Sequence, residues 1–97
     1  MAVYLISSID VTDRERYEEY HDRGMALVEN HGGRYLVSGG NTRVLRGDST
    51  PQRLTIIEFD DVGSVEAMFA SDEFESLREL AQGTVEGTLV QVEGVER

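Results

Sequence analysis

The sequence contains no cysteine and no lysine, and its only proline is Pro51. Without cysteine the chain cannot form disulfides, use a thiolate nucleophile or build Cys-ligated zinc or iron–sulfur sites, which excludes a secreted disulfide scaffold. Because no Pro-rich or Gly/Ser-rich stretch marks a linker, we expect residues 1–97 to form a single domain. The first ten residues lack a basic region, and Ser7 and Ser8 interrupt their apolar run. This start argues against a signal peptide or a membrane span and predicts a cytoplasmic protein.

Charge of one sign dominates the composition. Nineteen acidic residues and nine basic ones, all arginine, give a net charge of −10. A domain this negative repels phosphate backbones and anionic lipid surfaces, so neither nucleic acid nor a membrane is an expected partner. Dense carboxylates repel one another unless salt screens them, within about 3 Å at 1 M, so the composition suggests a halophilic source. Without salt adaptation, a genome rich in G and C favours arginine over lysine, and many ordinary proteins are acidic.

Short runs of β-branched and aromatic residues predict four strands. They cover residues 3–9, 34–37, 53–59 and 88–92. After a bulge or turn at 39–41, we interpret residues 42–46 as a continuation of the second strand or a short strand of their own. Residues 47–51, which include Pro51, are predicted to form the turn before the third strand.

Apolar residues spaced by threes and fours predict helices at 13–31, 62–70 and 72–82. Thr12 and Glu15 have the spacing of a capping box, so Thr12 is the expected N-cap of the first helix. Gly32 and Gly33 can end that helix in a left-handed C-terminal cap. Asp60 and Asp61 precede the second helix and Ser71 precedes the third, where short polar side chains can accept hydrogen bonds from free backbone N–H groups.

The predicted order, strand–helix–strand–strand–broken helix–strand, is that of a ferredoxin-like βαββαβ fold of the α+β class. Such a fold has a four-stranded antiparallel sheet with helices on one face. The third strand is apolar on both sides, with Leu54 and Ile56 on one face and Ile57 and Phe59 on the other. Because a chain of this size buries only about two-thirds of its unfolded surface, the face without helices should be covered by a second copy. We therefore expect a homodimer of the α+β barrel type.

Several short motifs together resemble one known family. In chain order they are Tyr17-x-x-Tyr20, His31-Gly-Gly-Arg-Tyr-Leu-Val37, Gly39-Gly40, Glu58-Phe59, Ser71-Asp-Glu-Phe74 and Val92-Glu-Gly-Val95. Over nearly the whole chain this pattern is similar to the domain-of-unknown-function 1330 family. That family looks like a branch of the dimeric α+β barrel superfamily, in which two ferredoxin-like protomers press their sheets together and leave a small pocket in each half. The resemblance implies this architecture and names no reaction.

The chain departs from the expected family pattern at two positions. Ser38 stands where we expect an arginine before Gly-Gly, and Ala81 where we expect a second arginine in the late helix. If those arginines hold an anionic ligand in relatives, this chain has Arg34, with Arg43 and Arg53 as nearby alternatives, to do so.

Glu58 is the candidate catalytic residue. It follows Leu54 and Ile56 on one strand face, which we expect to be the covered face of the sheet. Desolvation there would raise the pKa of the carboxyl toward the range of a general base. An ion pair with an arginine such as Arg34, or a strand-end carboxylate that reaches water, accounts for the same residue without a function.

Tyr20 and Arg34 are the candidate ligand-binding residues. Tyr17 and Tyr20 lie on the helix face that meets the sheet, and we expect Tyr17 to pack there while the Tyr20 hydroxyl reaches a pocket, with His21 toward the exposed side. Arg34 can bind a ligand carboxylate or pair with one of the chain's many acids. Tyr35 is expected to pack on the sheet.

Other familiar site patterns are missing from the sequence. His21 and His31 are the only histidines and have no metal-ligand spacing, so we expect no metal site and interpret His31 as a cap at a helix C-terminus. There is no Gly-x-Ser-x-Gly elbow of a serine hydrolase. The double glycines lack the nucleotide-binding patterns, and no tightly bound cofactor is expected.

Two functions remain open at this point. In the first, a homodimer binds a small organic molecule in a mostly apolar pocket between the sheets, lined by Tyr20, Arg34 and Glu58. An enzyme of this kind would transform the molecule without a cofactor, with Glu58 as proton acceptor and Arg34 as electrostatic clamp. In the second, the dimer is a non-catalytic structural or stress-related binding protein in which Glu58 and Arg34 form a structural pair. An RNA-recognition domain of the same topology is disfavoured by the charge and by the missing aromatic platform.

Overall fold

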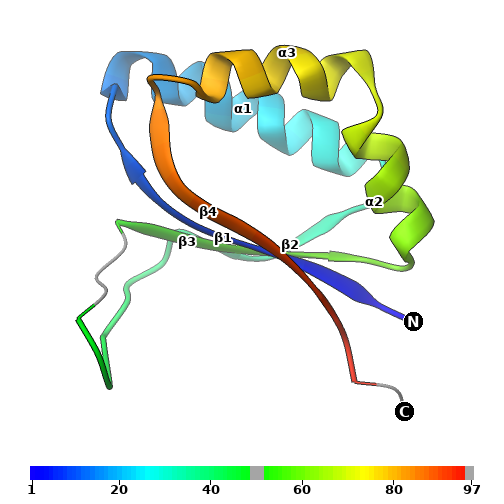
Figure 1. Cartoon of the computed structure of the whole chain (residues 1–97), viewed down its shortest axis with the longest axis horizontal. Coiled ribbons are helices and arrows are strands. Elements are labelled where there is room, and N and C mark those ends of the chain that lie inside the picture. Colours follow the sequence, from blue (N-terminus) through cyan, green and yellow to red (C-terminus); the bar gives the residue numbers. More distant parts are fainter. Residues whose placement is uncertain (49–51, 96–97) are drawn as a thin grey trace.

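A computed structural model of the chain describes residues 1–48 and 52–95. The elements follow the order β1 (Val3–Val11), α1 (Arg14–Asn30), β2 (Arg34–Ser38), β3 (Arg53–Phe59), α2 (Val62–Phe69), α3 (Asp72–Ala81) and β4 (Val85–Glu93). The strands form one antiparallel sheet in the order β2-β3-β1-β4. Figure 1 shows the three helices on one side of this sheet. The ferredoxin-like βαββαβ fold predicted from the sequence is confirmed.

Side chains fix where the helices begin. Asp13, and not Thr12, is the N-cap of α1, because its carboxylate accepts hydrogen bonds from the backbone N–H groups of Glu15 and Arg16 at 3.1 and 3.2 Å. The backbone N–H groups of Thr12 and Asp13 both donate to the carbonyl of Thr84, which ties the start of the helix to the residue before β4. A carboxylate is also favoured over a hydroxyl here by the helix dipole.

The caps of the two later helices agree with the sequence. Asp61 accepts from the backbone N–H of Ser64 at 2.9 Å, and Ser71 accepts from that of Phe74 at 3.2 Å. At the end of α1, Gly32 has a φ of 83°, the left-handed conformation predicted for its C-terminal cap. These caps fix the lengths of the helices that cover the sheet.

The segment between β2 and β3 differs from the prediction. Residues 42–46 form no strand, and the part of the predicted turn at 49–51 lies outside the described residues. A bulge between Tyr35 and Val37 shifts the register of β2, and Gly39, at a φ of 68°, turns the chain out of the sheet while its N–H donates to the carbonyl of Leu54. β2 therefore ends at Ser38.

The edge strand β4 is longer than the prediction of residues 88–92. It begins at Val85, which pairs with Val11 of β1. The residue before it, Thr84, is fully buried and its hydroxyl donates to the carbonyl of Leu80 at 2.6 Å. Because this contact fixes the chain immediately after α3, pairing with β1 starts at once.

The hydrophobic core lies between the helices and one face of the sheet. On β1 and β3, alternate residues point toward the helices and are at most 7% exposed, namely Val3, Leu5, Ile57 and Phe59. They pack with Leu27 and Val28 of α1, Val65 and Met68 of α2 and Leu77 of α3. At these positions the helices of the same chain cover the sheet.

The other face of the sheet has no helix over it. We call it the open face, and its central row crosses all four strands in register, from Val37 through Ile56 and Ile6 to Val90. Val37 is 37% exposed and Val90 is 52% exposed. In Figure 1 this face lies on the side away from the helices, toward which the end of β4 also bends. Among the described residues, no helix is long and apolar enough to cross a membrane.

Candidate functional site

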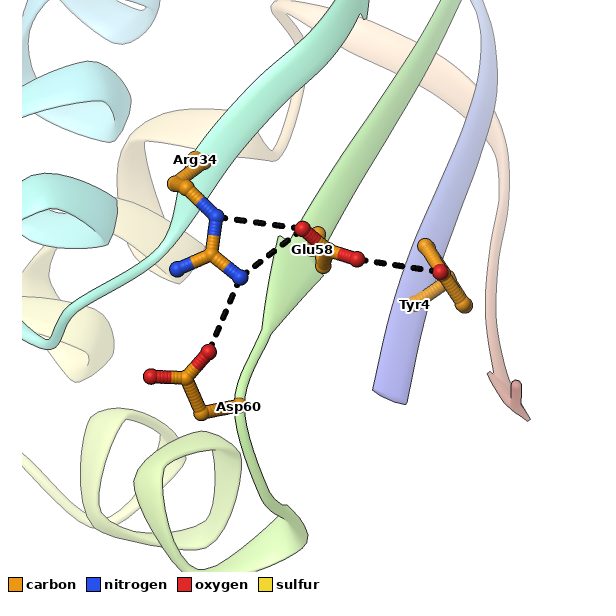
Figure 2. A network of polar contacts seen from close by, with 4 residues as sticks. All are labelled: Tyr4, Arg34, Glu58 and Asp60. Carbon is orange, nitrogen blue, oxygen red and sulfur yellow. Dashed lines mark hydrogen bonds and ion pairs between the residues drawn. The ribbon is translucent and has the colours of Figure 1, made fainter. Parts of the chain in front are cut away.

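Glu58 lies on the open face of the sheet, in the centre of a polar network (Figure 2). Strand pairing places Arg34 of β2 on one side of it and Tyr4 of β1 on the other. The Arg34 Nε and Nη2 atoms donate to Glu58 Oε1 at 3.1 and 2.8 Å, and the Tyr4 hydroxyl donates to Oε2 at 3.0 Å. Arg34 Nη2 also donates to Asp60 Oδ1 at 2.9 Å. Both carboxylate oxygens of Glu58 are therefore engaged.

Two predictions for Glu58 were wrong: the face of the sheet on which it lies and the direction in which its pKa is shifted. Leu54, Ile56 and Glu58 share the open face, because Ile57 and Phe59 occupy the positions that meet the helices. Hydrogen bonds from Arg34, and then from Tyr4, hold the pKa of the Glu58 carboxyl below its ordinary value, against an opposing effect of desolvation. Hydrogen bonds to the two carboxylates likewise raise the pKa of Arg34. A carboxylate with a lowered pKa is a weak proton acceptor at neutral pH.

The lowered pKa of Glu58 predicts a pH-dependent contribution to stability. When the folded pKa lies below the unfolded value of about 4.3, the stabilisation is complete above the unfolded pKa and is lost as the pH falls through the folded pKa. We expect Glu58→Gln to lower the melting temperature by a few degrees at pH 7 and by progressively less below pH about 4.

Thermal unfolding of both proteins between pH 3 and pH 7 checks this. Glu18→Gln, at an exposed position of α1, is the matched control and should follow the wild type throughout. Equal melting temperatures for Glu58→Gln and wild type at pH 7 would show that the network does not stabilise the fold.

A cavity of about 110 Å³ lies on the other side of the sheet, between the sheet and the helices. Its lining is mainly aliphatic and aromatic and comes from every helix and every strand. The aromatic residues are Tyr17, Tyr20, His21, Tyr35, Phe69 and Phe74. A more open recess of about 300 Å³ between α3 and β4 shares six of its lining residues with the cavity, so the two adjoin.

Hydroxyl groups are the main polar groups of the cavity. Ser7, Ser38 and Thr55 from the sheet and Tyr20 from α1 line it, and their hydroxyls have no hydrogen-bond partner within the described part of the chain. Burial raises the pKa of Tyr20, with a smaller contribution from Tyr17, and burial raises that of Tyr35 to about 12. Both phenols are therefore neutral near pH 7 and able to donate hydrogen bonds.

The structure does not bring the three predicted site residues together. Tyr20 lines the cavity on the helix side, whereas Arg34 and Glu58 lie on the open face. Arg34 forms ion pairs with Glu58 and Asp60, so a ligand anion would have to compete with these two carboxylates for its guanidinium. A single chain therefore has a cavity with Tyr20 and a separate ion-pair network with the other two.

Sequence reasoning missed His21 as a cavity residue and placed it toward solvent. His21 lines the cavity, its ring centroid is 5.8 Å from that of Tyr17, and its side chain is 32% exposed. The signal was present, because His21 is four residues after Tyr17 and three before Gly24 on the same helix face. His31 is a C-cap as predicted, with Nδ1 3.0 Å from the Leu27 carbonyl oxygen.

The two positions that depart from the expected family pattern both face these hollows. Ser38 lines the cavity and Ala81 lines the adjoining recess. Tyr17 and Tyr35, which we expected to pack, also border the cavity. Within residues 1–48 and 52–95 no three histidine or carboxylate side chains are grouped as metal ligands.

The four-stranded antiparallel sheet, with its helices on one face and a cavity beneath them, defines a protein of the ferredoxin-like α+β fold. Residues 2–95 match the family described as "Domain of unknown function (DUF1330)", and the chain belongs to this family. The resemblance read from the short motifs is thereby confirmed. No protein of curated function matches the sequence significantly.

Solved structures with the same fold share little sequence with this chain. A protein of unknown function from Rhodopseudomonas palustris superposes with a TM-score of 0.82 at 16% identity, covering 99% of this chain and 84% of its own. SnoaB, a cofactor-independent oxygenase from Streptomyces nogalater, has a TM-score of 0.69 at 13% identity, with 99% and 95% covered. A putative antibiotic biosynthesis monooxygenase from Caulobacter crescentus has a TM-score of 0.61 at 14% identity, with 98% and 91% covered. At these identities the likeness shows the fold alone.

Proposed function

We propose that this protein is a homodimer that binds a small, largely apolar organic molecule in the cavity of each protomer. The observation that carries the proposal is the lining of the cavity, where aromatic rings adjoin hydroxyl groups that the described chain does not use. Ligand sites are typically apolar hollows with a few polar groups that orient the ligand. Tyr20 is assigned to this site as a ligand-binding residue.

The size of the cavity limits the ligand. An apolar cavity of about 150 Å³ accepts benzene, whereas sites for drug-sized molecules are about 300–1,000 Å³. The cavity here, at about 110 Å³, suits a single ring or a short branched chain, and the adjoining recess of about 300 Å³ can take a polar extension. The proposed ligand is therefore a small molecule with one compact apolar end.

The open face supports the dimer. Its central row, Val37, Ile56, Ile6 and Val90, carries no charge, and beside it Arg34 neutralises Glu58. Two copies, each with a net charge of −10, can bring these central rows together without burying a charged side chain, and the carboxylates of Asp10 and Glu86 lie beyond the row, at one end of the same face. An uncovered apolar row across a whole sheet is typical of an interaction surface.

Arg34 and Glu58 then act as a structural pair on the open face, where the second copy is proposed to bind. The hydrogen bonds between Arg34 and Glu58 favour this structural role over proton transfer by Glu58. The proposal therefore concerns binding first. Catalysis without a cofactor, with Glu58 as proton acceptor, remains a prediction that a turnover assay on Glu58→Gln would test.

Titration with benzyl alcohol, an uncharged one-ring probe, tests the binding function. We expect saturable binding of one probe per chain with a dissociation constant of about 1 mM or lower, because eight non-hydrogen atoms readily supply about 4 kcal/mol. Isothermal titration calorimetry of the purified protein measures both values. Binding that does not saturate, or none at all, would contradict the proposed function.

A further inference from the structure

Arg53 is held beside the cavity by two contacts from distant parts of the chain. As the first residue of β3 it lies opposite Ile9, and its guanidinium carbon is 5.4 Å from the centroid of the Tyr17 ring on α1. A side chain at Gly39 would overlap the guanidinium, so the absence of one lets the group lie against the backbone there. Stacking on an aromatic ring orients the planar guanidinium before any ligand arrives.

This guanidinium has no acidic partner among the described residues. Its Nε atom is buried without a hydrogen-bond partner, whereas Arg34 and Arg78 are each paired with a carboxylate. Acidic residues outnumber arginines by nineteen to nine, so a half-buried arginine that pairs with none of them is conspicuous. A buried donor without an acceptor costs free energy that a bound anion would recover.

The neighbours of Arg53 belong to the cavity. Ile9, opposite it in the sheet, and Tyr17, beneath its guanidinium, both line the cavity. Two of the unpartnered hydroxyls, those of Ser38 and Thr55, come from the strand ends next to it. Arg53 is not itself a lining residue, but its guanidinium lies against the Tyr17 ring at the edge of the cavity, near the hydroxyl groups of Ser38 and Thr55.

We infer that Arg53 binds the anionic end of the ligand, and that the ligand class is small monocarboxylates with one ring or a short branched chain. The inference rests on the proposed function, since it assigns the polar end of the same site. The apolar body lies in the cavity, and the carboxylate accepts hydrogen bonds from the guanidinium fork, an arrangement that a neutral isostere cannot reproduce.

Benzoate and benzyl alcohol form the matched pair of probes, because they share the ring and differ in charge. In the wild type, benzoate should bind about tenfold more tightly than benzyl alcohol, and acetate, which lacks the ring, about tenfold more weakly than benzoate. Arg53→Gln should weaken benzoate binding about tenfold and leave benzyl alcohol within about twofold. Arg46→Gln, at an exposed arginine in residues 39–48, should change the binding of neither probe. Calorimetric titration measures each dissociation constant.

If Arg53→Gln does not fold, the variant Arg53→Lys provides a second test of the inference. Arg53→Lys retains the charge and loses the fork, so it should weaken benzoate binding severalfold without affecting benzyl alcohol. If benzyl alcohol binds but benzoate is not preferred, or Arg53→Gln leaves the preference intact, the inference fails and the proposed function stands. Loss of the preference in Arg78→Gln, at the adjoining recess, with Arg53→Gln unaffected would also overturn it. If neither probe binds the wild type, the proposed function itself fails.

Discussion

Replacing Val90 by glutamate should convert the protein from a dimer into a folded monomer. Val90 ends the central row of the open face and is 52% exposed in the single chain, so a glutamate there is solvated in the monomer. In the proposed dimer the same carboxylate must leave water without a partner, at a cost of several kcal/mol per ion, which corresponds to a dissociation constant raised about a thousandfold or more.

Sedimentation equilibrium at low salt and in 1 M salt measures the mass. The wild type should sediment with twice the 10.8 kDa mass of the chain under both conditions, because the central row of the proposed contact is apolar and uncharged. Val62→Glu is the matched control, since Val62 is 43% exposed on the helix side and should leave the dimer intact. A folded wild-type monomer in molar salt would contradict the dimer, and a dimer that survives Val90→Glu would place the interface elsewhere.

Replacing Gly24 by leucine should abolish binding of benzyl alcohol without destabilising the fold. Gly24 lies within α1 and lines the cavity, and a Cβ atom there would lie 3.8 Å from Leu77 Cδ2, an ordinary contact distance. A leucine side chain would extend into the cavity and should raise the dissociation constant by at least about tenfold. Removing a helical glycine favours the helix by up to about 1 kcal/mol, so the melting temperature should hold or rise by about 4–8 °C.

A filled cavity and an unfolded protein both abolish binding, so binding and thermal stability must be measured on the same variant. Calorimetric titration and thermal unfolding should therefore be run on Gly24→Leu and on Gly40→Leu. A Cβ atom at Gly40 would meet no atom within 4 Å, and Gly40 is outside the cavity lining, so its variant should bind as the wild type does. Unchanged binding by a folded Gly24→Leu protein would show that the probe occupies another place.

The fold could be predicted from local sequence patterns. Short β-branched runs, helix-spaced apolar residues and the caps at Asp61, Ser71 and Gly32 predicted every strand and helix that the structure contains. The errors are at ends, where tertiary contacts decide. The Asp13 carboxylate caps α1 one residue after the predicted Thr12, and the left-handed Gly39 ends β2, where the sequence allowed the strand to continue.

The candidate site was harder to predict, for a physical reason. β3 is apolar on both faces, so alternation alone could not show whether Glu58 or Phe59 points toward the helices. The pair of Glu58 with Arg34 was foreseen as an alternative and is present. The position of the Arg53 guanidinium depends on Tyr17 and Gly39, which lie far from it in the chain. No local sequence pattern therefore predicts where the guanidinium lies.

We propose that the ligand occupies the cavity between the helices and the sheet, and not the open face. Backbone NMR spectra of the ¹⁵N-labelled wild type, recorded while benzyl alcohol is added, test this most directly. We expect saturable shift changes at cavity residues such as Ser7, Gly24 and Leu77, with little change at Glu58 and Val90. Shift changes centred on Glu58 and Val90, with the cavity residues unmoved, would contradict it.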